Sequence, residues 1–174
     1  MIEIPEAVEF FEPSTPAGST SEVFLNYLNY FRSKLVAKVR LMPEADQRAS
    51  RLPSGWTPLE LIKHLRFMER RWLVWGFEGQ AIPDPWADRV GDRWHVNDDE
   101  TLDTLVAGLA EQAATTRSIV KAHDLSEVGQ PSGRWAGKPP PTLDRILFHM
   151  MQEYARHVGH IDIVCELATG TEEE

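Results

Sequence analysis

TLDRILFHMMQEYARHVGHIDIVCELA, residues 142–168, carries the strongest helical pattern of the chain. Its inward residues recur at alternating steps of four and three, the spacing of a helix face in a bundle. That stripe contains Glu153, His157 and His160. At about 100° per residue, His157 lies about 40° from Glu153, and His160 lies about 20° from it on the other side. A buried helix face rarely carries such residues, so they require a partner or a function.

The bulk composition is typical of one globular domain. The chain has 174 residues, 42% of them hydrophobic and 26% charged, which is enough for a sizeable core. A net charge of −9 argues against nucleic acid or an anionic membrane as partner, because both require a basic patch. The sequence shows neither a membrane span nor a signal peptide, and its single cysteine, Cys165, excludes an internal disulfide framework. We therefore expect a cytoplasmic protein that acts on a small molecule.

Three further helices are predicted before this one, over about residues 20–42, 58–76 and 101–123. Each follows a run typical of a helix N-terminus: Ser19-Thr-Ser-Glu22, Thr57-Pro58-Leu-Glu60 and Asn97-Asp-Asp-Glu100. In the second helix, Trp72 and Trp75 are expected to continue the core face, and the cluster Glu69-Arg-Arg71 is expected to form a solvated face. No segment alternates strongly enough to predict a strand.

The remaining segments are two long loops and two irregular ends. Residues 77–98 and 124–141 form the loops, the second of them rich in proline and glycine. Residues 1–18 read as a lead-in and residues 171–174 as an acidic tail. With no repeat and no domain break, we predict one all-α domain over residues 1–174, a four-helix bundle with two long connecting loops. Such bundles build metal sites from inward side chains on facing helices.

Glu153 and His157 are spaced so that both can bind one metal ion. The third ligand has to come from another helix, and His64 is the best candidate because it lies on the apolar face of the second helix. Two histidines and a carboxylate, with a fourth position open, are typical of catalytic zinc. The same donors accept nickel, iron or manganese. His160 remains a candidate fourth ligand, a partner that orients a ligand, or a general base.

A metal-free cluster is the alternative interpretation. A single inward histidine is more often a hydrogen-bonded core residue than a ligand, and an inward glutamate is usually paired with a cation. An uncompensated buried carboxylate is costly, however, so a bound ion explains Glu153 and His157 together. His149 is expected to pack or to support the ligands, while Trp56, Trp86 and Trp94 are expected to wall a pocket above the metal.

Two segments resemble the DinB-like family of metal-binding bundles. They are Trp56-Thr-Pro-Leu-Glu-Leu-Ile-Lys-His64-Leu with Glu69-Arg-Arg-Trp72, and Leu147-Phe-His149-Met-Met-Gln-Glu153-Tyr-Ala-Arg-His157-Val-Gly-His160-Ile-Asp162. The branch is similar to the N-terminal domain of mycothiol-dependent maleylpyruvate isomerase, over about residues 20–170. That isomerase has a further C-terminal domain that contributes to its active site, so we do not expect activity on maleylpyruvate here.

The resemblance implies an up-up-down-down bundle that holds a divalent metal, zinc first and nickel second, at His64, Glu153 and His157. It also implies a low-molecular-weight thiol cosubstrate of the mycothiol or bacillithiol type, and it is compatible with a homodimer. The first hypothesis is thus a metal-dependent thiol S-transferase in which His160 orients a ligand or handles a proton. A hydrolase that uses metal-bound water is the second, and a non-catalytic metal-binding or stress-response bundle is the third.

Overall fold

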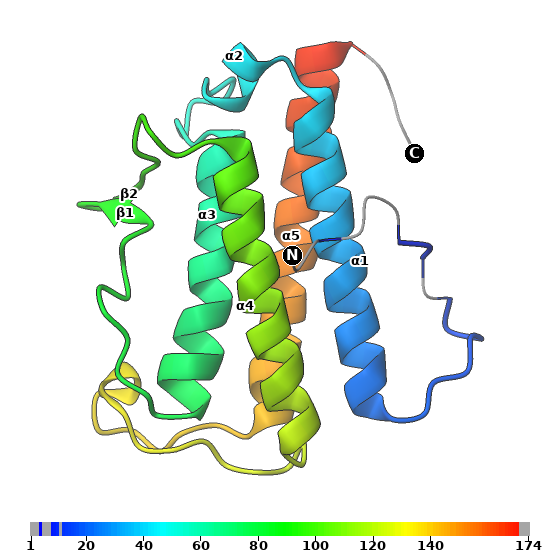
Figure 1. Cartoon of the computed structure of the whole chain (residues 1–174), viewed down its shortest axis with the longest axis vertical. Coiled ribbons are helices and arrows are strands. Elements are labelled where there is room, and N and C mark those ends of the chain that lie inside the picture. Colours follow the sequence, from blue (N-terminus) through cyan, green and yellow to red (C-terminus); the bar gives the residue numbers. More distant parts are fainter. Residues whose placement is uncertain (1–3, 5–7, 11, 171–174) are drawn as a thin grey trace.

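The computed structural model describes residues 4, 8–10 and 12–170 and consists mainly of helices (Figure 1). The long ones are α1 (Thr20–Leu41), α3 (Pro58–Glu69), α4 (Leu102–Ala122) and α5 (Leu143–Thr169), and α3 continues directly into the π-helix η1 (Arg70–Phe77). The predicted all-α bundle is confirmed. The expected lead-in is described only in part, and the expected acidic tail, residues 171–174, lies outside the described residues.

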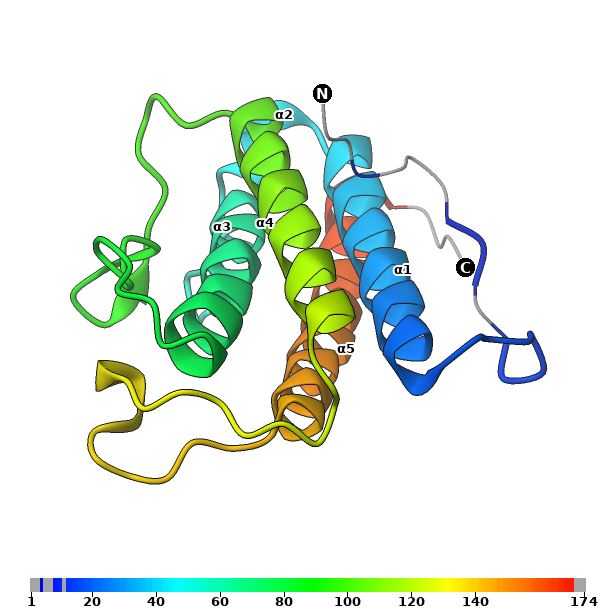
Figure 2. The same cartoon turned by 60° about the horizontal axis from the view of Figure 1, so that its bottom comes forward.

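The helix directions differ from the expected up-up-down-down order. Phe31 and Lys38 of α1 meet Tyr154 and Asp162 of α5, so these two helices run in the same direction. Figures 1 and 2 show α3 and α4 running together in the opposite direction. The order is therefore up-down-down-up. The reason is that the segment between α1 and α3 turns back at one end of the bundle, whereas the loop between η1 and α4 travels its whole length.

Short elements lie within the connections. The helix α2 (Glu44–Gln47) lies between α1 and α3, and the strands β1 (Arg89–Val90) and β2 (Arg93–Trp94) form a small antiparallel hairpin in the loop after η1. The 3-10 turn η2 (Gly133–Trp135) lies in the loop after α4. None of them was predicted, because two- to four-residue elements give no detectable periodicity. No helix in the described part of the chain is both long and apolar enough to cross a membrane.

Local capping explains where most helices begin and end. The predicted capping box at α3 is present, with Thr57 Oγ1 accepting from the Glu60 amide and the Glu60 carboxylate accepting from the Thr57 amide. Gly170 ends α5 in the left-handed conformation, with φ of 70°. The start of α4 differs from the prediction, since Thr101 rather than the Asn97 run provides the N-cap.

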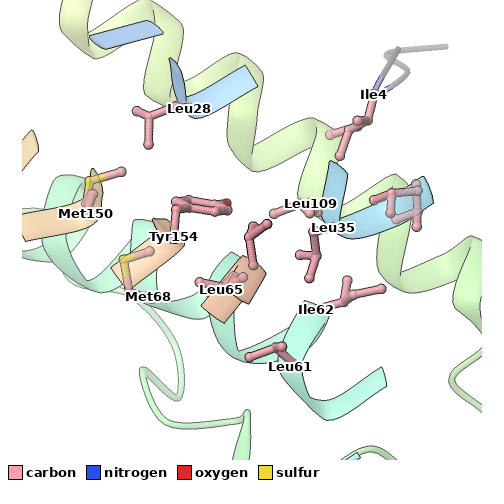
Figure 3. Packing of buried hydrophobic residues seen from close by; sticks show 14 of the residues in the cluster. Ile4, Leu28, Leu35, Leu61, Ile62, Leu65, Met68, Leu109, Met150 and Tyr154 are labelled. Carbon is pink, nitrogen blue, oxygen red and sulfur yellow. The ribbon is translucent and has the colours of Figure 1, made fainter. Parts of the chain in front are cut away.

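The helices enclose one cluster of buried apolar side chains (Figure 3). Leu28 and Leu35 of α1 pack there with Leu65 of α3, Leu109 of α4 and Met150 of α5. Each of these five is 2% exposed or less, so each contributes about 1.5–3 kcal/mol by leaving water. This core fixes the positions of the polar side chains that interrupt it.

One polar cluster, the Glu69 cluster, joins all four long helices at mid-height. Arg32 donates from Nε and Nη2 to the two carboxylate oxygens of Glu69, at 2.8 and 2.7 Å. Thr116 Oγ1 donates at 2.5 Å, and the Tyr154 hydroxyl donates to the same carboxylate. All four residues are 1% exposed or less. The charge of Glu69 is therefore balanced and hydrogen-bonded within the interior, as a buried ion requires.

Candidate metal centre

The three residues predicted as metal ligands lie together in the bundle. His64 comes from α3, and Glu153 and His157 come from α5; His64 and His157 are buried and Glu153 is half-buried. One ligand atom from each lies within 4.8 Å of those of the other two. Within the described part of the chain, no other group of His, Cys, Asp or Glu side chains meets this criterion. We call these three residues the His64 cluster.

Glu153 lies between two imidazoles. Its Oε2 is 3.3 Å from His157 Nε2, and its Oε1 is 3.5 Å from His149 Nε2. The hydrogen bond with His157 lowers the pKa of Glu153 and outweighs the opposing effect of partial burial. Glu153 is therefore an ionised carboxylate at neutral pH. His149 touches the cluster through Glu153, which agrees with the supporting role predicted for it.

Asp88 orients the ring of His64. His64 Nδ1 is 3.1 Å from Asp88 Oδ2, and Arg71 donates to both oxygens of Asp88, at 2.7 and 3.0 Å. Burial opposes ionisation of Asp88, but the hydrogen bonds with His64 and Arg71 outweigh it and lower the pKa of Asp88. An ionised carboxylate can only accept, so His64 carries its proton on Nδ1. Its Nε2 then has the free lone pair that a metal requires.

The electrostatics keep His64 in the form that binds metals. Burial lowers the pKa of His64 and outweighs the hydrogen bond with Asp88, which acts in the opposite direction. The ring is therefore neutral near pH 7, and neutral imidazole is the metal-binding form. His64 and His157 face each other with ring centroids 5.4 Å apart and an interplanar angle of 74°.

His157 contains a buried nitrogen without a partner. Its Nδ1 forms no hydrogen bond with the described residues. Leaving such a group unpaired in the interior costs about 1–3 kcal/mol. One ring nitrogen of His157, the neutral ring of His64 and the ionised Glu153 together make a donor set that fits a divalent cation.

His160 lies beside the His64 cluster and does not belong to it. Its ring centroid is 5.4 Å from that of His157 and 6.2 Å from that of Trp56. Burial, together with His157 and Arg156, lowers the pKa of His160. The ring is partly exposed, so it is a neutral imidazole that solvent or a substrate can reach.

Two tryptophans form an aromatic wall against the cluster. The Trp94 ring stacks on His64 at 4.2 Å and lies 5.5 Å from the ring of His157. Trp56 follows at 6.3 Å from Trp94. Both line an open cavity of about 300 Å³, together with Ser54, Gly55, Glu60, Asp92 and Arg93. The expectation of a pocket above the metal is met only in part. Trp56 and Trp94 line this cavity, but no residue of the His64 cluster lines it, and Trp86 lies under the guanidinium of Arg71, 4.3 Å away.

A family model for the mycothiol S-transferases matches residues 23–170, which is most of the chain. The chain belongs to the mycothiol S-transferase family. This is a DinB-like family, so the resemblance noted in the sequence is confirmed. No curated protein matches the chain.

Membership in the mycothiol S-transferase family agrees with the donor set. The matched segment contains the whole His64 cluster together with His160 and Asp88. The family indicates S-transferase-like activity on a small molecule, and the His and Glu side chains indicate a divalent metal.

Sequence reasoning missed Asp88 and Arg71. Arg71 was assigned to a solvated face because a run of charged residues is typical of one, although it lies seven residues after His64 and therefore on nearly the same helix face. From Arg70 onward the helix is a π-helix, in which residue i bonds to i+5, and Trp72 and Trp75 in it are only half-buried. Asp88 lies in a long loop without periodicity. The available signal was its chemistry, because a histidine that binds a metal usually donates its other nitrogen to a carboxylate.

Proposed function

We propose that the protein is a divalent-metal-dependent thiol S-transferase whose metal ligands are His64, Glu153 and His157. The observation that carries this proposal is the convergence of two imidazoles and one ionised carboxylate within 4.8 Å of one another. Three protein ligands leave a coordination position open, as catalytic sites require. Zinc suits these donors best, and nickel is the second candidate.

The substrate of that open position is a low-molecular-weight thiol, mycothiol first and bacillithiol second. A bound divalent cation lowers the pKa of a thiol that coordinates it and so supplies a thiolate near pH 7. Asp88 keeps the Nε2 of His64 available by accepting from its Nδ1. The wall of Trp56 and Trp94 supports the apolar faces of the sugar rings of mycothiol, and the 300 Å³ cavity beside them gives them room.

His160 is the candidate proton acceptor. It is neutral near pH 7, it is partly exposed, and it lies one helical turn beyond His157. In this proposal it takes the proton that the incoming thiol loses, or it hydrogen-bonds the thiol and so orients it. Both roles require only that the ring stays outside the metal coordination.

The test combines metal analysis with a transferase assay. The purified protein and His157→Ala are loaded with zinc, the zinc content is measured, and the rate of thiol addition to a chromogenic electrophile is followed. We expect about one zinc per wild-type chain and at least a 100-fold lower rate in His157→Ala. His123→Ala is the matched control, because it removes an imidazole that hydrogen-bonds Glu127 instead of a cluster residue.

Two outcomes would contradict the proposal. Equal rates in wild type and His157→Ala would mean that the His64 cluster takes no part in the reaction. Turnover of an ester or amide without any thiol would favour the hydrolase instead.

A further inference from the structure

The loop between α4 and α5 is docked against η1. Figures 1 and 2 show its turn, in yellow, beside the end of the α3–η1 helix. Trp135 Nε1 donates to the carbonyl oxygen of Gly76 at 3.1 Å, and the Gln130 amide donates to that of Phe77 at 2.7 Å. A Cβ on Gly76 would lie 2.9 Å from the Trp135 ring, so the contact requires glycine. The loop therefore holds its side chains in fixed positions.

This loop brings Arg134 against two indole rings. Its guanidinium carbon lies 4.2 Å from the centroid of Trp72 and 5.7 Å from that of Trp135. Among the described residues Arg134 has no hydrogen-bond or ion-pair partner, and its Nε is buried. The side chain as a whole is only half-buried, so the guanidinium remains within reach of a ligand. Arg134 is therefore a cation held in place by the loop that has no counter-ion in the described part of the chain.

One chain of contacts and one electrostatic effect connect Arg134 to the His64 cluster. In the first, the Trp72 ring lies 4.5 Å from that of His149, whose Nε2 is 3.5 Å from Glu153. The second connection is electrostatic: besides burial, the charge of Arg71 lowers the pKa of Arg134, and Arg71 binds the Asp88 that orients His64. Arg134 thus lies at the edge of the candidate centre.

The charges at this edge favour an anion. The chain as a whole carries a net charge of −9, yet Arg134 is stacked on Trp72 and Trp135 here without a carboxylate partner among the described residues. Asp88 is already engaged by Arg71 and His64. An anionic group that reaches Arg134 would supply the missing partner and would bind beside the indole rings of Trp72 and Trp135, whose centroids are 5.9 Å apart.

We propose that Arg134, with Trp72 and Trp135, forms a subsite for the carboxylate of an aromatic electrophile, the second substrate. This inference rests on the proposed transferase function, which requires such an electrophile. A guanidinium binds a planar carboxylate through two parallel hydrogen bonds, and the indole rings provide apolar surface for an attached ring.

The position of Arg134 and Trp72 relative to α5 indicates that this subsite binds the electrophile rather than the thiol. Trp56, which lines the 300 Å³ cavity, lies beside His160, whereas Trp72, which carries Arg134 on its ring, lies beside His149. At about 1.5 Å per residue, those two histidines are separated by about 16 Å along the helix, with Glu153 and His157 between them. Mycothiol has no carboxylate, since its cysteine carboxyl group forms an amide. Bacillithiol does carry carboxylates, so a comparison of the two thiols distinguishes a carboxylate of the thiol from one of the electrophile.

Calorimetry on the zinc-loaded full chain tests the subsite without turnover. Benzoate is titrated into wild type, Arg134→Gln and Arg134→Lys, with neutral benzamide as the matched ligand. We expect at least tenfold weaker benzoate binding in Arg134→Gln, an intermediate loss in Arg134→Lys, and equal benzamide binding in all three. Lys138→Gln, which removes an exposed cation of the same loop, should bind benzoate like wild type. Circular dichroism confirms that each variant is folded.

Kinetics with two electrophiles then show whether the carboxylate that binds Arg134 belongs to the electrophile or to the thiol. The substrates are 4-chloro-3,5-dinitrobenzoate and its methyl ester. In both, the thiol sulfur bonds to the ring carbon that bears chlorine, chloride leaves with the bonding electrons, and the thiol proton passes to a base. With mycothiol, Arg134→Gln should lower kcat/KM for the acid at least tenfold, mainly through KM, and for the ester less than twofold.

Equal benzoate binding in wild type and Arg134→Gln would overturn the proposed subsite. An equal loss of kcat/KM for the acid and the ester would also overturn it. So would a loss of kcat/KM that appears only when bacillithiol attacks the ester, because the bound carboxylate would then belong to the thiol. Failure of the transferase function gives a different pattern. No thiol transfer would occur with either electrophile, while the difference in benzoate binding would persist.

Discussion

The Glu69 cluster and the His64 cluster are two groups of polar side chains inside the same bundle. Tyr154 belongs to the first and Glu153 to the second, although they are neighbours in α5. Around Glu69, one guanidinium and two hydroxyl groups from three other helices donate to the carboxylate. In the His64 cluster the donor atoms converge on one another, and His157 Nδ1 has no partner among the described residues.

The difference separates a structural cluster from a functional one. A buried group whose hydrogen bonds are all formed by the protein stabilises the packing and needs nothing from outside. A set of metal-binding side chains that converge within 4.8 Å, one of which keeps a buried nitrogen without a protein partner, is completed by a cation. Mutations should therefore affect the two clusters differently: folding stability for the first, and metal binding for the second.

The largest effect is expected for Glu69→Ala. The variant leaves the Arg32 guanidinium in the interior without its carboxylate, and removing one partner of a buried ion pair costs about 3–5 kcal/mol. Denaturant unfolding followed by circular dichroism measures this loss. Glu166→Ala, on the exposed side of α5, should change the free energy of unfolding by less than about 0.5 kcal/mol. A loss below about 1 kcal/mol in Glu69→Ala would mean that the buried pair is not stabilising.

The sequence predicted the His64 cluster better than it predicted the Glu69 cluster. His64, Glu153 and His157 were found because helical periodicity assigns each residue to a face, and metal-binding residue types on an apolar face are rare. Glu69 was missed because glutamate, arginine and arginine in succession are typical of a solvated face. Its inward position depends on partners from three other helices, which a local pattern cannot reveal.

The helix directions and the loops were harder to predict for a related reason. The crossing of the η1–α4 loop along the bundle depends on which helix faces pack together. Asp88 and Arg134 lie in loops, where no periodicity indicates the direction of a side chain. Their positions follow from tertiary contacts with Arg71 and Trp72 of η1.

Zinc should stabilise the protein through the His64 cluster alone. At a free zinc concentration 100 times the Kd, binding adds about 2.7 kcal/mol, and a chain of this size should melt about 5–11 °C higher. His157→Ala should lose the shift, while His123→Ala should retain it. Thermal melts with zinc and with a chelator measure the effect. A full shift in His157→Ala would exclude this histidine as a ligand.

Asp88→Asn should weaken metal binding without removing a ligand. Asparagine offers an amide instead of an ionised acceptor, so the proton on His64 Nδ1 and the ring orientation are no longer fixed. Loss of such a supporting carboxylate typically lowers metal affinity 10- to 100-fold. Competition with a chromogenic chelator gives the Kd, and Asp99→Asn, an exposed residue of the same loop, is the control. An unchanged Kd in Asp88→Asn would mean that Arg71 and the packing alone position His64.

The smallest effect is expected for Tyr154→Phe. This variant tests most directly whether the Glu69 cluster and the His64 cluster act independently. The variant removes one hydroxyl donor from Glu69, which keeps Arg32 and Thr116, so the loss should be about 1–2 kcal/mol of unfolding free energy. The zinc Kd should change less than threefold, although Tyr154 directly follows Glu153 in the chain. The same denaturant and chelator measurements serve for both values. A tenfold weaker Kd would show that the Glu69 cluster also positions the ligands on α5, because a purely structural group would affect unfolding alone.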